Sequence, residues 1–130
     1  MAASSDVAAG NQATAAQYNN LRADVLDNLL YTELFTVAHN PVGINAWEDW
    51  DVSALVPAGV TDIEVAIKCP TAALGAGVRN NGSALDRRLT PAQGVSFTMW
   101  SPVDASRVCE IYGKALTDIF QIIGYLARWV

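Results

Sequence analysis

The stretch from Val60 to Arg88 constrains the fold of this chain more than any other. Within it, VTDIEVAIK carries Ile63, Val65 and Ile67 at alternate positions, separated by polar or small residues. A period of two is the pattern of a β-strand with one buried face and one wetter face. An Asn-Asn-Gly run follows at 80–82, and these residue types tolerate the positive φ of a tight turn. The stretch therefore predicts a central β-hairpin to which the other strands add.

Most of the chain from residue 31 onward repeats this alternation. YTELFTV puts Tyr31, Glu33, Phe35 and Val37 on one side of a strand. Further strand-like runs, separated by Pro and Gly, are AWEDWDVSALV, VSFTMW, RVCEIYG and IFQIIGYLARWV. About seven or eight short strands with regular turn signals are typical of an antiparallel sandwich or barrel. We therefore expect a mainly β fold, an antiparallel β-sandwich over residues 31–130. Its last run is apolar on both faces, so it is expected to be central or covered by a neighbour.

Residues 1–30 are expected to form an arm and one amphipathic helix that precede the sandwich. A TAAQ capping box opens the helix. Tyr18, Leu21, Val25 and Leu29 then follow at helical spacing, so they share one face. A helix of about four turns is marginal alone in water, so this apolar stripe must pack on its own sandwich or on a sister subunit. We predict that residues 1–30 serve attachment or oligomerisation.

Composition and charge exclude several classes of function. The net charge is −5, with thirteen acidic and eight basic residues, which argues against nucleic acid as a partner. The first residues have neither the basic region nor the apolar core of a signal peptide, and no window approaches the roughly 18 apolar residues of a membrane span. Because 52% of the residues are hydrophobic and only 16% are charged, we expect some apolar surface to be reserved for a partner.

No arrangement in the sequence indicates catalysis, a metal site or a cofactor. His39 is the only histidine, and its place beside Asn-Pro is interpreted as a solvated loop. The acidic run at 48–51 puts two carboxylates on one face of a strand and one on the other, so neither a calcium site nor a carboxylate pair is expected. Cys69 and Cys109 lack metal-binding spacing and are expected to be buried free thiols.

Tryptophan is abundant for a chain of this length. The four residues are Trp47, Trp50, Trp100 and Trp129. Packing in cores and interfaces is the commoner use of tryptophan, and stacking on sugar rings is the alternative. We predict that Trp47, Trp50 and Trp129 join the helix stripe in an oligomer or attachment interface.

Several motifs resemble those of virion proteins of tailed bacteriophages. The segment AGNQATAAQYNNLRADVLDN resembles an N-terminal helix of tail-fibre and minor structural chains. WEDWDVSALVPAGVTDIEVAI, GVRNNGS, WSPVDASRVCEIYG and IIGYL are similar to a small β-sandwich in the same chains. The resemblance covers almost the whole chain, and its motifs are turns and strand ends rather than catalytic signatures. It implies a jelly-roll-like module that oligomerises, commonly as a trimer.

Together these observations predict a structural virion protein without enzymatic activity. We expect a homotrimeric capsid decoration or fibre-like subunit that contacts the major capsid protein or a tail protein and is assembled in the host cytoplasm. The alternative is a tail-associated module that binds a receptor or a host surface glycan through exposed tryptophan. An enzyme is a more distant alternative, and it would depend on His39.

Overall fold

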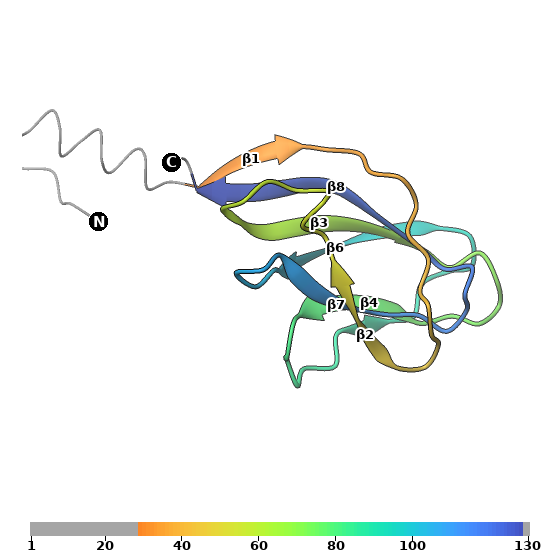
Figure 1. Ribbon diagram of the computed structural model, residues 1–130. Helices are drawn as coiled ribbons and strands as arrows, with labels where there is room; N and C mark the ends of the chain where they lie inside the picture. The colour runs from red at the N-terminus through yellow and green to blue at the C-terminus, as the bar shows by residue number, and fades with distance from the viewer. Residues whose placement is uncertain (1–28, 129–130) are drawn as a thin grey trace, which may run out of the picture. The chain divides into compact units, whose positions relative to one another are not determined.

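The computed structural model describes residues 29–128, which form two antiparallel β-sheets (Figure 1). The strands are β1 (Leu29–Glu33), β2 (Trp47–Asp51), β3 (Val60–Lys68), β4 (Ala76–Asn80), β5 (Arg88–Leu89), β6 (Ser96–Pro102), β7 (Val108–Tyr112) and β8 (Ile119–Arg128). The prediction of a mainly β, antiparallel, sandwich-like fold is confirmed. The described residues contain no helix, and hence none that could cross a membrane.

The strands pair as one long hairpin whose two arms are rolled together. Sheet one has the order β1-β8-β3-β6 and sheet two the order β2-β7-β4-β5. The first strand therefore lies beside the last, the second beside the seventh, the third beside the sixth and the fourth beside the fifth. Figure 1 shows β1, β8 and β3 in one layer and β2, β7 and β4 in the other. The closing strand β8 is central, between β1 and β3, which is one of the two positions that its apolar faces predicted.

The predicted central hairpin is confirmed only in part, because β4 and β5 pair antiparallel on either side of the Asn-Asn-Gly turn but β3 does not pair with them. β3 lies in sheet one and β4 in sheet two, so these consecutive strands do not pair. At the turn, Gly82 has a φ of 77° and the backbone N–H of Ser83 donates to the carbonyl of Asn80 at 3.1 Å. The returning strand β5 has only two residues. Alternation identified the buried face of β3 but could not identify its partners, which are distant in sequence.

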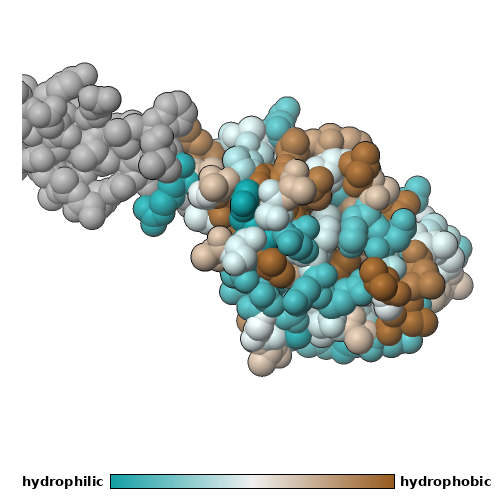
Figure 2. All heavy atoms as spheres, viewed as in Figure 1, coloured by the Kyte–Doolittle hydropathy of each residue, from teal (hydrophilic) through white to brown (hydrophobic). Residues whose placement is uncertain are grey.

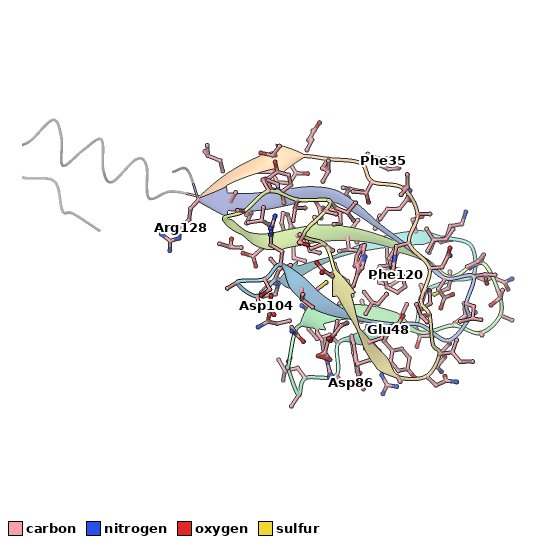
Figure 3. All side chains as sticks on the ribbon, in the orientation of Figure 1. Phe35, Glu48, Asp86, Asp104, Phe120 and Arg128 are labelled. Carbon is pink, nitrogen blue, oxygen red and sulfur yellow. The ribbon has the colours of Figure 1, made fainter. Side chains whose placement is uncertain are left out.

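The core lies between the two sheets and is built from alternate side chains of both. Ile63, Val65 and Ile67 on β3 are fully buried, as the alternation predicted. Trp50 of β2 and Phe120 of β8 are also buried, and Figure 3 shows Phe120 in the space between the sheets. Each sheet thus buries one face against the other, which is the arrangement of a sandwich.

Both cysteines are buried and unpaired, as predicted. Burial raises the pKa of the Cys109 thiol to about 12. Burial is also the largest cause of the raised pKa of Cys69, and the nearby carboxylate of Asp118 raises it further. Because the thiolate is the reactive form, neither thiol is a ready nucleophile at neutral pH.

The sheet begins slightly earlier than the sequence indicated. β1 starts at Leu29, so this residue belongs to a strand and not to the end of the predicted helix. Its position beside β8 accounts for the difference, because sheet pairing overrides a helical spacing pattern. The rest of the predicted helix, with Tyr18, Leu21 and Val25, lies outside the described residues, as does Trp129. Their role in an interface stays a prediction.

His39 is held against the core, so its interpretation as a solvated loop residue is wrong. Its imidazole stacks on the Trp50 ring, with centroids 4.9 Å apart and planes 14° from parallel. Its backbone exchanges two hydrogen bonds of 2.9 Å with Phe120 of β8. The chain after β1 continues beside β8, which brings this loop residue onto the core.

We expect the pKa of His39 to lie below its ordinary value of 6.5. Partial burial disfavours the imidazolium, and the charge of Glu48 offsets this only in part. The unfolded chain therefore binds a proton more readily, so the contribution of His39 to stability is complete above pH ~6.5 and declines as the pH falls toward the folded pKa. An NMR titration of this single histidine measures the value directly. A pKa at or above that found for the same residue in urea would contradict the prediction.

Candidate functional site

The chain between β1 and β2 carries the most exposed apolar side chains of the described residues. Phe35, Val37 and Val42 are 76%, 81% and 85% exposed, and Ile44 is also exposed. We call these four residues the apolar edge segment. The segment runs along the edge of sheet one and crosses to sheet two, and Figure 2 shows apolar side chains at the surface along this path. Apolar side chains gathered at a surface mark sites of contact with other molecules.

The outward position of Phe35 and Val37 follows from the burial of the residue between them. Thr36 is buried, its N–H donates to the carbonyl of Ile122 at 3.1 Å, and its Oγ1 accepts from the N–H of Ile122 at 3.0 Å. Leu34, two residues before Thr36, also packs against the core. Because side chains of an extended chain alternate between faces, Phe35 and Val37 face solvent.

A bulge in β8 shapes the same face of sheet one. Glu64 lies opposite Gly124 and Val65 lies opposite Ile122, so Ile123 is an extra residue. Bulges bend the strand and re-aim side chains, and they are frequent near functional sites. Here Ile123 becomes part of the lining of a shallow hollow of about 400 Å³, which is completed by Tyr31, Glu33, Leu34 and Phe35.

Beside this hollow, two aromatic rings from the opposite edge strands of sheet one meet over its outer face. Tyr31 of β1 and Trp100 of β6 have ring centroids 6.0 Å apart, with planes at 63°. The Tyr31 hydroxyl donates to Glu64 Oε2 at 3.2 Å. The Tyr31 ring occupies the space above Gly124, where any Cβ would collide with it. The glycine thus allows the tyrosine to reach across β8.

Two carboxylates surround the Tyr31 ring. Its pKa is raised, first by partial desolvation and then by the hydrogen bond and charge of Glu64, with a further contribution from Glu33. We call Tyr31, Glu33, Glu64 and Trp100 the aromatic–acid cluster. Tyr31 is 49% exposed and Trp100 is 39% exposed, so both rings can be reached from solvent.

The outer face of sheet two also carries aromatic rings, but arginines of the same chain cover them. The Arg79 guanidinium lies over the Trp47 ring at 4.1 Å from its centroid. The Arg88 guanidinium lies over the Tyr112 ring at 4.7 Å. Arg79 also forms a salt bridge of 2.8 Å with Glu110. The aromatic rings of this face are therefore already in contact with partners from the same chain.

Two of the residues predicted to form an interface are tryptophans of β2, and neither is a free surface residue. Trp50 is only 3% exposed and belongs to the core, so its assignment to an interface is wrong. Alternation along β2 turns it inward, where it packs on His39 and Phe120. Trp47 points to the other side and is half-buried beneath Arg79.

The acidic run of β2 stabilises loops. Glu48 accepts hydrogen bonds from the N–H groups of Val42 and Gly43, at 2.8 and 3.0 Å. Asp51 accepts from the N–H of Ser53 at 2.9 Å, and its pKa is lowered first by hydrogen bonding with the Ser53 side chain and then by this backbone hydrogen bond. In the part of the chain that the structure describes, no group of His, Cys, Asp and Glu residues could hold a metal ion.

Sequence reasoning missed both features of sheet one. It grouped Tyr31, Phe35 and Val37 on one side of a strand, and that alternation was the available signal, but it could not tell which side faces solvent. Nothing in the sequence indicated that Glu64 and Trp100 would join Tyr31. Comparisons of the chain with protein-family models, with curated proteins and with solved structures gave no match.

Proposed function

We propose that this chain is a structural subunit that assembles with copies of itself through the apolar edge segment. The observation that carries the proposal is the exposure of Phe35, Val37, Val42 and Ile44 on one continuous stretch of a small β protein. Burying a side chain of this size in an interface gains about 1.5–3 kcal/mol. Four such residues would gain free energy of the same order as the roughly 4–15 kcal/mol that association costs.

The backbone of the same stretch favours contact by strand addition. The N–H groups of Leu34 and Thr36 both donate inward to β8 at 3.1 Å. Because N–H groups of an extended chain point alternately to its two sides, that of Phe35, between them, faces away from the sheet. An open edge of this kind can pair with a strand of another molecule. A second copy would meet both free backbone groups and exposed apolar side chains.

The motifs that resemble virion proteins support a place for the assembly in a tailed-phage particle. The strand order, with neighbours 1-8-3-6 and 2-7-4-5, is that of an eight-stranded jelly roll, an architecture common in viral capsid domains. We propose a homotrimer that decorates the capsid or forms part of a fibre, bound to the major capsid protein or a tail protein. Assembly would take place in the host cytoplasm.

The double variant Phe35→Asp/Val37→Asp tests the assembly. We expect it to weaken self-association about a hundredfold or more, because each change places an unpaired charge where an apolar side chain is buried. The measurement is analytical ultracentrifugation of the full chain over a range of concentrations. Circular dichroism establishes that the variant keeps its fold.

Leu85→Asp is the matched control, because Leu85 is also exposed but lies in the loop between β4 and β5. This variant should assemble like the parent chain. A parent chain that is monomeric at high concentration, or a double variant of unchanged size, would sink the proposal. The virion assignment has a separate test, which is mass spectrometry of purified phage particles from cells that produce the chain. Its absence from the particles would contradict that part alone.

A further inference from the structure

In sheet two, arginine side chains of the same chain cover the aromatic rings of the outer face. Arg79 lies over Trp47 and pairs with Glu110, and Arg88 lies over Tyr112 and pairs with Asp86. In each case one guanidinium contacts an aromatic face and a carboxylate together. Guanidinium groups suit this pair of partners because they are planar, weakly hydrated and able to donate several hydrogen bonds.

The aromatic–acid cluster of sheet one has the same two partners, but among the described residues no guanidinium lies over its rings. Tyr31 and Trp100 supply the rings, and Glu64 and Glu33 supply negative charge beside them. Within residues 29–128, the guanidinium groups found over rings are those of Arg79 and Arg88, and neither lies at this cluster. Arg87 donates to the backbone carbonyl of Trp100 at 2.8 Å, which fixes β6 to the neighbouring loop.

We propose that the aromatic–acid cluster binds the guanidinium group of an arginine side chain from a protein partner. The ring surfaces of Tyr31 and Trp100 would receive the flat face of the guanidinium, and Glu64 would accept its N–H groups. The hollow of about 400 Å³ that begins at Tyr31 gives room for the rest of the side chain. The site adjoins the apolar edge segment at Phe35, which lines the hollow, whereas Val37, Val42 and Ile44 do not line it.

NMR titration of the full chain with N-acetyl-arginine amide tests the site. Each of the four tryptophans carries one indole N–H, and the Trp100→Phe variant identifies the signal of Trp100. We expect the Trp100 signal to shift with a dissociation constant on the order of millimolar, since an exposed cation–π contact with one carboxylate is weak. N-acetyl-citrulline amide, which has the same shape without the charge, should bind at least about tenfold more weakly.

Variants locate the interaction. Glu64→Gln should weaken binding about tenfold, because it removes the charge and keeps the size of the side chain. Trp47→Ala, on the outer face of sheet two, should leave binding unchanged. The Val42→Asp/Ile44→Asp variant, in the part of the apolar edge segment that does not line the hollow, should still bind arginine amide, which separates this site from the assembly interface.

Several results would overturn the proposal. Equal shifts with the citrulline amide would show that charge is not recognised. Equally tight binding of tetramethylammonium would show that the site does not select guanidinium. A response to methyl glucoside with none to arginine amide would assign the rings to a sugar. Unchanged affinity in Glu64→Gln would place the ligand elsewhere.

Discussion

Replacing Trp50 by alanine is expected to lower the free energy of unfolding by about 3–5 kcal/mol. The indole fills the centre of the core, packing edge-on against Phe120 with centroids 6.3 Å apart and stacking on His39. Its removal leaves a cavity that the two sheets cannot close without losing contacts elsewhere. Urea denaturation followed by circular dichroism measures the loss.

Trp47→Ala is the matched control for Trp50→Ala. The two tryptophans lie three residues apart on the same strand, yet Trp47 is half-buried and packs on Tyr112 and Arg79. Its removal should cost about 1–2 kcal/mol, from lost apolar area and one cation–π contact. Equal losses for the two variants would mean that Trp50 does not fill the core as described.

Asp118→Ala is expected to destabilise the chain by about 2–4 kcal/mol. Asp118 is fully buried, and its Oδ2 accepts hydrogen bonds from the N–H groups of Lys114 and Ala115, at 2.9 and 3.1 Å. These bonds close the turn that leads into the central strand β8. Alanine would leave both donors without their acceptor in a partly buried place, where that loss is costly. Thermal unfolding should show a midpoint lower by roughly 10 °C.

Asp118→Asn separates hydrogen bonding from charge. Asparagine keeps one oxygen that can accept from the same two N–H groups, and it removes a buried carboxylate whose Oδ1 has no hydrogen-bond partner. We expect this variant to keep most of the stability that alanine loses. A loss as large as that of the alanine variant would mean that the turn depends on the negative charge itself.

Alternation in the sequence was sufficient to predict the β class and the buried face of β3. Each of these depends on one strand and the period of its own side chains. Strand pairing cannot be predicted in this way, since it depends on which distant strand offers a matching face. For that reason β3 is not part of the predicted hairpin, and it lies in a different sheet from β4 and β5.

Burial at the edge of sheet one could not be inferred from hydrophobicity. In YTELFTV the apolar side, with Phe35 and Val37, faces solvent, whereas Thr36 is inside. Threonine is tolerated there because its hydroxyl accepts a hydrogen bond from the N–H of Ile122, next to the bulge. The sequence does not indicate this hydrogen bond, because the bulge exists only in the folded sheet. The contact between the exposed rings of Tyr31 and Trp100 could not be predicted for a similar reason. The two residues are almost seventy positions apart in the sequence and meet only across two other strands.

The rolled-hairpin pairing also governs how quickly this fold can form. β1 and β8 are neighbours although they stand at opposite ends of the described chain, and only the β4–β5 contact is local. A large entropy of loop closure must therefore be overcome before the long-range contacts gain any free energy. Proteins of such high contact order fold in about milliseconds to seconds. Until β8 docks, the edges of β1 and β3 that it will join stay unpaired. During that interval, a newly made chain in the cell can pair wrongly with other chains through these edges.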